Sequence, residues 1–351
     1  MLVLVVSTGA LSTPIVPQQS DGDQTPTVRL ARPTWDTGWF QAEIQRILLE
    51  RLGFEVHGPV TMENERFYAA VSSGDVDLWA NGWFPLHAPL IGRDDETDIV
   101  GTQVSGGALQ GYLVDIETAE RLGIDDLSDL SEPEAAEVFD VDGNGLADLV
   151  GCNLEWACGP VIDHHLQAYG LTETVEQVQA DYSPLMEDTV RRFRSGEPVL
   201  FYTFTPNWTV GRLRPGVDVR WLEVPFPSLP PGAEEGIDDT TVPGLAGCVS
   251  DPCDTGWPIN DIRGVANRGF LSANPQVRTL LEQVEIPLED ILEQNAAMVE
   301  GEGEVSDIVS HASDGSSRTR RPCQVGSKRP IRMRSRCRVV ERVAVEQPCG
   351  G

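Results

Sequence analysis

Two cysteines bracket a tryptophan in residues 151–159, and this spacing is suited to binding an anion. Cys152 and Cys158 lie six positions apart around Trp156, and an apolar, helix-compatible segment follows them. A disulfide-closed loop at the start of a helix would present backbone N–H groups to an anion beside an aromatic face. The alternative is a purely structural disulfide with a packed tryptophan.

Aromatic residues also gather where strands are expected to end or helices to begin. Trp35 and Trp83 follow expected strands, Trp156 precedes a helix, and the run 201–208 contains Phe204 and Trp208. A cage of such rings would attract a quaternary ammonium, which cannot donate hydrogen bonds, through the ring quadrupoles. Each ring taken alone is more often packed in a core or at its rim. Convergence on one cleft would separate the two interpretations.

The motifs of common enzymes are absent from the sequence. It contains no GxSxG, no GxxxxGK[ST] and no GxGxxG after a strand, so it predicts no cofactor. The adjacent His164 and His165 would point to different faces of a helix. The remaining enzyme hypothesis is a secreted hydrolase, thiol-dependent through Cys152 or Cys158, or calcium-dependent.

One acidic loop resembles the start of a calcium-binding loop. Asp140, Asp142, Asn144 and Asp148 occupy positions one, three, five and nine, and a glycine stands at position six. Oxygen ligands at these positions converge on a hard cation, so the loop predicts a structural calcium site. Position twelve is glycine instead of the usual glutamate. The alternative is an Asx-turn structure that shapes the approach to Cys152.

Charge limits the partners of the chain. Its 351 residues carry 55 acidic and 26 basic side chains, a formal net charge of −29, which argues against nucleic acid and anionic membranes. The basic side chains cluster at the end: residues 312–351 hold ten Lys and Arg against three acids. We therefore expect residues 312–351 to be a basic tail outside the fold.

The other end of the chain and the cysteines both indicate export. Residues 1–24 begin with a short apolar run followed by small and polar residues, which is typical of a secretory signal and too short to span a bilayer. Cys152 with Cys158, and Cys248 with Cys253, form two close pairs that predict disulfides in an exported protein. Zinc is the alternative, although the spacings are not those of zinc sites.

Apolar patterns place these residues on alternating strands and helices. Residues 27–31 and 76–80 are expected strands, and residues 40–52 are an expected amphipathic helix. Alternating strands and helices predict an α/β fold with a mostly parallel sheet, which binds ligands at the carboxyl ends of its strands. Trp35 and Trp83 both fall at such ends.

Four motifs, taken together, resemble a known family. They are Trp83-x-Pro85-Leu86-His87, Gly151-Cys152-Asn153-x-x-Trp156-x-Cys158, Tyr202-Thr203-Phe204-Thr205-Pro206-x-Trp208 and Trp221-Leu222-x-Val224-Pro225-Phe226. In order and spacing they resemble the glycine betaine/proline betaine substrate-binding proteins of osmoprotectant ABC importers, from about residue 28 to about residue 311.

This resemblance implies a two-lobed, type II periplasmic binding-protein fold with two crossovers. Residues 25–112 plus 226–311 would form lobe 1, and residues 113–225 lobe 2. Such proteins work in the periplasm or outside the cell and deliver ligand to a membrane permease and its ATPase. Choline, carnitine or another compatible solute is the alternative ligand.

The resemblance also assigns roles to individual residues. Tryptophans box the methylated ammonium in the family, which implies Trp83, Trp156 and the position of Phe204, where the family pattern has tryptophan. A histidine and loop amides hold the carboxylate, which implies His87 and the backbone of Ala157 and Cys158. The nearby Trp35 and Trp208 complete the expected ligand-binding set.

Overall fold

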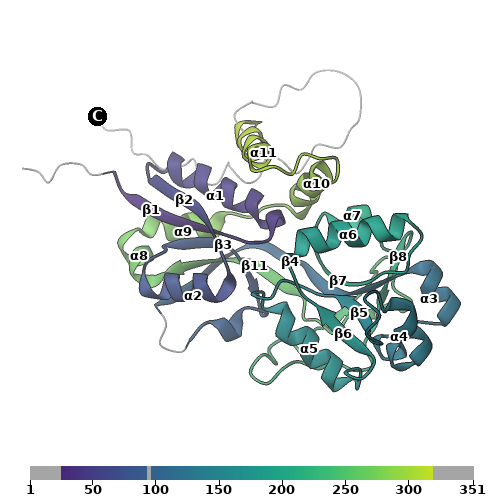
Figure 1. Cartoon of the computed structure of the whole chain (residues 1–351). Helices are drawn as coiled ribbons and strands as arrows, with labels where there is room; N and C mark the ends of the chain where they lie inside the picture. The colour runs from purple at the N-terminus through teal and green to yellow at the C-terminus, as the bar shows by residue number, and fades with distance from the viewer. Residues whose placement is uncertain (1–24, 93–95, 319–351) are drawn as a thin grey trace, which may run out of the picture.

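The structure, a computed structural model, describes residues 25–92 and 96–318. It contains two α/β lobes with a shared core (Figure 1). The expected signal-like segment 1–24 lies outside the described residues. Within the described part of the chain, no helix is both long enough and apolar enough to cross a membrane.

Nine of the described strands form one sheet that passes from lobe 1 into lobe 2, and lobe 1 is built on its part β2-β1-β3-β11-β4. β1 pairs in parallel with β2 and β3, whereas β11 runs antiparallel to β3 and β4. The strands that lie wholly in this lobe are β1 (Thr27–Pro33), β2 (Glu55–Met62), β3 (Leu78–Phe84) and β11 (Asn260–Asn267). Its helices are α1 (Trp39–Arg51), α2 (Asn64–Ser73), α8 (Arg268–Ala273), α9 (Pro275–Gln283), α10 (Leu288–Val299) and α11 (Val305–Arg318), with short 3-10 turns η1 (Asp36–Gly38) and η2 (Ala88–Leu90).

Lobe 2 has a similar α/β architecture on the other part of this sheet. β5 pairs in parallel with β6 and β7, and β4 runs antiparallel to β7 and β8. The strands that lie wholly in this lobe are β5 (Ala147–Val150), β6 (Val175–Val178), β7 (Leu200–Thr205) and β8 (Val219–Leu222). Its helices are α3 (Ile116–Leu122), α4 (Pro133–Phe139), α5 (Cys158–Ala168), α6 (Tyr182–Arg194) and α7 (Thr209–Arg212), with the 3-10 turn η3 (Leu127–Ser131).

A single long strand, β4 (Thr97–Asp115), runs through both lobes. Residues 97–108 pair with β11, and residues 109–114 pair with β7. The chain therefore crosses between the lobes inside a strand at residues 108–109, a few residues before the predicted boundary at 112. Ala108 pairs with Asn260 at the start of β11, so the first crossing lies beside the point where the chain enters β11.

Residues 226–258 pack on lobe 2 elements, although the sequence places them with lobe 1. This excursion contains the hairpin of β9 (Thr241–Val242) and β10 (Cys253–Asp254). The ring of Trp257 lies 6.0 Å from that of Tyr112 and 5.3 Å from that of Tyr202. His165 on α5 contacts the carbonyl of Ser228 at 2.8 Å. These contacts favour a second crossover near residues 258–260 instead of 225, because tertiary packing holds a segment that has no periodicity of its own.

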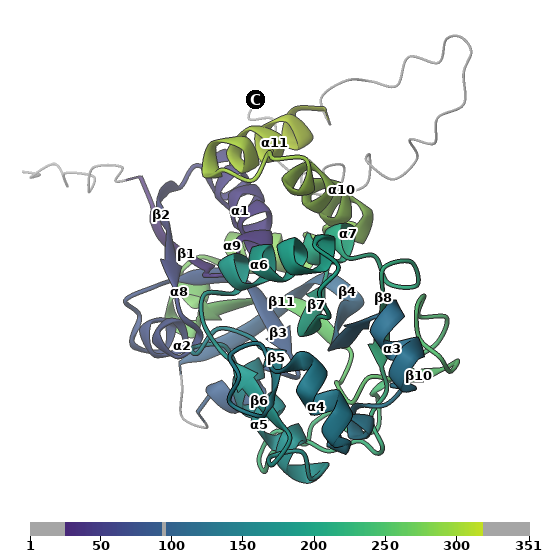
Figure 2. The ribbon, with the colours of Figure 1, turned by 45° about the vertical axis from the view of Figure 1, so that its right-hand side comes forward.

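The last helix extends beyond the point at which the basic tail was expected to begin. α11 continues to Arg318, and Ile308 and Ala312 are each 1% exposed, packed with Phe40 and Ile47 of α1. Figures 1 and 2 both show α11 beside α1 and α10. Any tail outside the fold therefore starts after residue 312, and residues 319–351 lie outside the described part.

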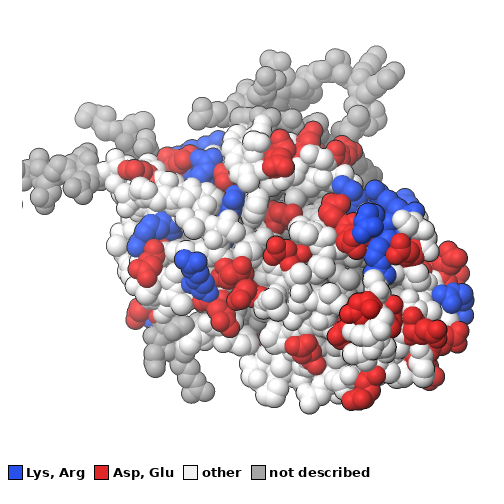
Figure 3. Space-filling view, viewed as in Figure 1, with Lys and Arg blue, Asp and Glu red and all other residues white. Residues whose placement is uncertain are grey.

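Acidic side chains are spread over the visible face of both lobes, as the net charge predicts (Figure 3). Basic side chains gather over α6 and α7, where several arginines form ion pairs with neighbouring acids. These pairs are Arg191 with Asp188, Arg192 with Glu197, Arg212 with Glu187, and, just beyond α7, Arg214 with Asp218. Paired surface charges of this kind contribute little to stability.

Candidate functional site

A cavity with about 300 Å³ of empty space, part of which is open to solvent, lies between the lobes. Eleven residues line it: Trp35, Asn64, Trp83, Leu86 and His87 from lobe 1, Gln110 from β4, and Trp156, Ala157, Cys158, Tyr202 and Phe204 from lobe 2. The set contains no Asp, Glu, Lys or Arg. A ligand with separated charges must therefore be held by rings and neutral donors.

Lobe 1 orients its two cavity tryptophans through one buried amide. Asn81 is 2% exposed, and its Oδ1 accepts a hydrogen bond from the indole N–H of Trp35 at 2.9 Å and from that of Trp83 at 3.0 Å. Asn81 and Trp83 lie on β3, and Trp35 follows β1, which pairs with β3. The carboxyl ends of neighbouring strands thus bring the two rings together, as the sequence predicts.

Four rings form an aromatic cage, defined here as Trp35, Trp83, Trp156 and Phe204. The ring of Phe204 lies 5.5 Å from Trp83 at 89° and 5.8 Å from Trp156 at 76°. Trp35 and Trp156 are 5.5 Å apart at 82°. Near-perpendicular rings form walls, and such walls suit a methylated cation that is attracted to ring faces. All four side chains are buried.

The start of α5 supplies the anion-binding part of the cavity wall. α5 begins at Cys158, and no side chain caps its first turn. Cys152 and Cys158 form a disulfide with Cα atoms 6.4 Å apart, as the sequence predicts. The N–H of Gly159 donates to the Trp156 carbonyl at 3.3 Å, and Pro160 has no N–H. The N–H groups of Ala157 and Cys158, together with the helix dipole, are therefore what favour negative charge at this point. The disulfide fixes the loop that carries Trp156 against this helix start.

His87 is a neutral, fully enclosed side chain. Its Nδ1 lies 3.0 Å from the Tyr68 hydroxyl and accepts from the backbone N–H of Trp83 at 3.3 Å. Burial lowers the pKa of His87 to about 3. Because Nδ1 accepts, the proton resides on Nε2, which is 3.2 Å from the Asn64 amide. Nε2 can therefore donate to Asn64, after its amide turns, or to a ligand.

Hydrogen bonds join the lobes next to the cavity. The Trp156 indole N–H donates to Thr34 Oγ1 at 2.7 Å, and the Ser183 hydroxyl donates to Asp36 Oδ2 at 3.0 Å. The indole of Trp208 also donates to Asp36, and burial raises the pKa of that carboxyl. The lobes are thus closed on each other in this structure.

The structure brings seven of the eight expected ligand-binding residues to the cavity: Trp35, Trp83, His87, Trp156, Ala157, Cys158 and Phe204. Trp208 does not line it and instead bonds to Asp36. Sequence reasoning missed Asn64, Gln110 and Tyr202. Tyr202 lies two residues before Phe204 on β7, and residues two apart in a strand share a face, which is the signal that could have found it.

The acidic loop keeps both of its predicted interpretations. Carboxylate oxygens of Asp140, Asp142 and Asp148 all lie within 4.8 Å of one another, a donor set that fits calcium. Asp140 Oδ1 also accepts from the backbone N–H of Gly143 at 2.7 Å, and Asp148 Oδ2 accepts from that of Val141 at 2.6 Å. The first is an Asx-type bond and the second closes the loop, and both shape it without a metal, so calcium binding stays a prediction.

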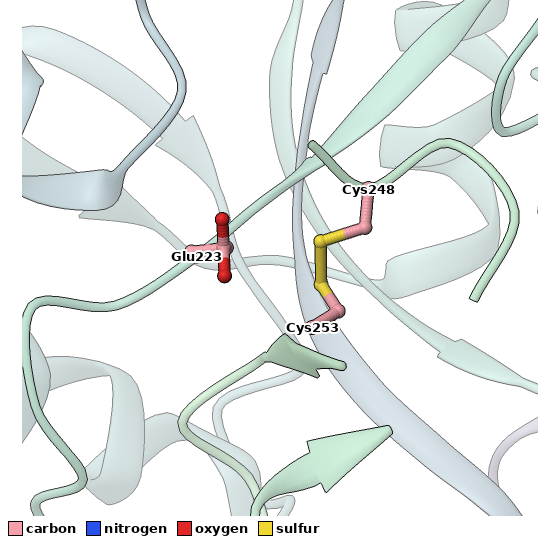
Figure 4. Close-up of side chains that lie close together, drawn as sticks. All are labelled: Glu223, Cys248 and Cys253. Atoms are coloured by element: carbon pink, nitrogen blue, oxygen red, sulfur yellow. A yellow bond between two sulfur atoms is a disulfide. The ribbon is translucent and has the colours of Figure 1, made fainter. Parts of the chain in front are cut away.

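The second cysteine pair is also a disulfide. Cys248 and Cys253 are bonded with Cα atoms 6.0 Å apart, and Glu223 lies beside them (Figure 4). Bonded sulfurs are not thiolates, so this group is not a metal site. The same reasoning removes a thiolate nucleophile at Cys152 or Cys158.

Two α/β lobes, two adjacent crossings and a cavity between the lobes are the architecture of a venus-flytrap solute-binding protein. Residues 26–312 match the substrate-binding domain of ABC-type glycine betaine transport systems, and the chain belongs to this family. It is therefore a binding protein of a transport system and not an enzyme.

Named relatives agree with this assignment. The chain is 39% identical over 315 residues to the glycine betaine-binding periplasmic protein OusX of Dickeya dadantii, covering 89% of this chain and 90% of the relative. It is 38% identical over 288 residues to the glycine betaine/proline betaine-binding periplasmic protein of Salmonella typhimurium, covering 81% and 84%.

Solved structures share the fold at low identity. An ABC-transporter choline-binding protein in complex with choline superposes with a TM-score of 0.64 at 16% identity, covering 84% of this chain and 89% of that one. Lactococcal OpuAC, closed on glycine betaine, superposes with a TM-score of 0.62 at 14% identity, covering 84% and 97%. The two-lobed type II fold is thereby confirmed.

Proposed function

We propose that this protein captures a zwitterionic quaternary ammonium such as glycine betaine or proline betaine. The observation that carries the proposal is the aromatic cage beside the uncapped start of α5, in a cavity whose lining has no charged side chain. The cage suits the diffuse cation, and the N–H groups of α5 suit the carboxylate. Ligand would then contact both lobes and stabilise the closed form.

The names of the relatives also indicate where in the cell the protein acts and with which partners. They are periplasmic, which supports an extracytoplasmic site of action for this chain. The family belongs to ABC-type transport systems, so the physiological partners in this proposal are a membrane permease and its ATPase. Choline and carnitine are the alternative ligands, and the Kd values of the protein for these two compounds and for betaines distinguish the possibilities.

Calorimetry with glycine betaine, proline betaine, choline, carnitine, proline and ectoine tests the proposal. We expect the tightest binding for a betaine, and Trp156→Ala should weaken it severalfold or more, since a ring facing a desolvated cation contributes on the order of 0.5–2 kcal/mol. Trp39→Ala is the matched control, because Trp39 lies at the start of α1 outside the cavity. Unchanged betaine affinity in both Trp83→Ala and Trp156→Ala would refute the proposed site.

A further inference from the structure

Two buried polar atoms in the cavity wall have no hydrogen-bond partner, Asn64 Oδ1 and Gln110 Nε2, and only the second is a donor. Gln110 lies on β4 just past the crossing between lobes and is 1% exposed. Its Nε2 makes no hydrogen bond, although the side chain lines the cavity. Buried donors are nearly always satisfied, and an orphaned one is costly. A donor that is closed off from solvent and lines a ligand cavity is therefore a candidate contact for the ligand.

The orientation of this amide is set by a neighbouring tyrosine. The Tyr202 hydroxyl donates to Gln110 Oε1 at 2.7 Å. Tyr202 is itself 2% exposed and packs against Trp257, with ring centroids 5.3 Å apart. Since Oε1 is engaged and the tyrosine is held by packing, both Nε2 hydrogens remain available as donors.

Strand register places Gln110 next to the aromatic cage. Gln110 pairs with Phe204 across β4 and β7, and Tyr112 pairs with Tyr202 two residues along. Paired residues of antiparallel strands share a face, so Gln110, Phe204 and Tyr202 project to the same side. The amide thus stands beside a cage ring in the cavity wall, within reach of a ligand whose ammonium is held by the cage.

We propose that Gln110 Nε2 donates a hydrogen bond to a carboxylate oxygen of the bound ligand and so favours zwitterionic betaines over purely cationic ligands. This rests on the proposed function and adds a specificity-determining residue to it. The physical reason is that the cavity lining has no cationic side chain to balance a carboxylate. Neutral donors must do so, and hydrogen bonds to an ionised acceptor are the stronger ones.

Replacement of the amide by an isosteric apolar side chain tests this inference. In Gln110→Met we expect the Kd for glycine betaine to rise about tenfold or more, the size of one lost hydrogen bond to a charged group. The Kd for choline, which has a neutral hydroxyl in place of the carboxylate, should rise less than about threefold. Tyr202→Phe, which releases the amide without removing it, should give an intermediate loss for glycine betaine.

Gln103→Met is the matched control. Gln103 is 0% exposed on the same strand, but it accepts from Gln45 Nε2 at 2.7 Å and lies outside the cavity. Its replacement should lower the melting temperature while leaving the ratio of the two Kd values unchanged. A separate readout is the Gln110 side-chain amide signal in a nitrogen–proton spectrum, assigned by its loss in Gln110→Met, which should shift and resist solvent exchange when glycine betaine is added.

Each outcome decides the inference. If the Kd of Gln110→Met for glycine betaine is within twofold of the parent's, or if its Kd values for glycine betaine and choline rise by the same factor, Gln110 does not donate to the carboxylate. An amide signal that does not change when glycine betaine is added would also contradict the inference. A parent protein that binds no quaternary ammonium would instead refute the proposed function, so the two failures are distinguishable.

Discussion

The indole N–H of Trp156 in lobe 2 donates a 2.7 Å hydrogen bond to the hydroxyl of Thr34 in lobe 1. Trp156 therefore has two roles: its ring lines the cavity, and its indole N–H stabilises the closed form by bonding to the other lobe. In an open form water would satisfy the same indole N–H, so this bond contributes to the closed form specifically.

Thr34→Val should therefore weaken ligand binding while changing the stability of the empty protein little. The substitution keeps the shape of the side chain and removes the acceptor, which costs the closed form on the order of 1 kcal/mol, or about fivefold in Kd. Calorimetry measures the affinity. Thr61→Val is the control, because Thr61 accepts from Arg32 at an exposed site away from the cavity. Equal effects of the two substitutions would contradict the interpretation.

Asn81→Ala should damage both the fold and the site. It leaves the buried indole N–H groups of Trp35 and Trp83 without their shared acceptor, a loss of about 1–3 kcal/mol in the free energy of unfolding. Since the two rings also lose their common anchor, betaine affinity should fall with stability. Urea unfolding and calorimetry on the same samples report the two effects, and a variant of parental stability would show that Asn81 does not hold the rings.

Acid should destabilise the protein before most carboxylates protonate. Burial lowers the pKa of His165 to about 4, below its ordinary 6.5, so below pH 6.5 the unfolded chain binds a proton that the folded chain does not. The unfolding free energy should fall from pH 6.5 towards pH 4, by up to about 1.4 kcal/mol per pH unit for this group.

Urea unfolding at pH 7.5 and pH 5 checks the role of this histidine. His165→Gln should show a smaller loss between the two pH values than the parent. His57→Gln, at a side chain that is 56% exposed, should behave as the parent does. Identical pH dependence in all three proteins would show that His165 does not set it.

Calcium, if it binds the loop of Asp140, Asp142 and Asp148, should raise the melting temperature. A ligand at 100 times its Kd stabilises the folded state by about 2.7 kcal/mol. The measurement is thermal unfolding with millimolar calcium and with chelator, for the parent and for Asp142→Asn. A melting temperature that is the same in both solutions would leave the Asx-turn structure as the whole explanation of the loop.

Short motifs were enough to indicate the cage, because Trp83 and Trp156 lie where a strand ends or a helix begins, and the resemblance of the motifs to a known family added the position of Phe204. Gln110 had no such signal, since a glutamine inside a strand becomes a cavity residue only through the register of β4 with β7. Trp208 was expected at the site from its closeness to Phe204, but the turn into α7 directs its indole to Asp36.

The lobe limits were harder to predict than the elements. Pro- and Gly-rich residues 226–258 have no periodicity, and Trp257 attaches them to Tyr112 and Tyr202 through tertiary contacts alone. At the end of α11, Ile308 and Ala312 are spaced for one helix face. The predicted end of the fold at residue 311 is too early, because the prediction followed the reversal of charge sign that begins near residue 312.

The pairing of Ala108 with Asn260 has a consequence for the order of binding events. Two covalent connections that lie side by side leave the lobes one rotational degree of freedom, about an axis through both connections. A group close to a rotation axis moves little, whereas groups far from it travel furthest. Gln110, two residues from Ala108, should therefore move little when the lobes open or close. We expect ligand to meet this amide first, and the bond between Trp156 and Thr34 to form only when rotation is complete.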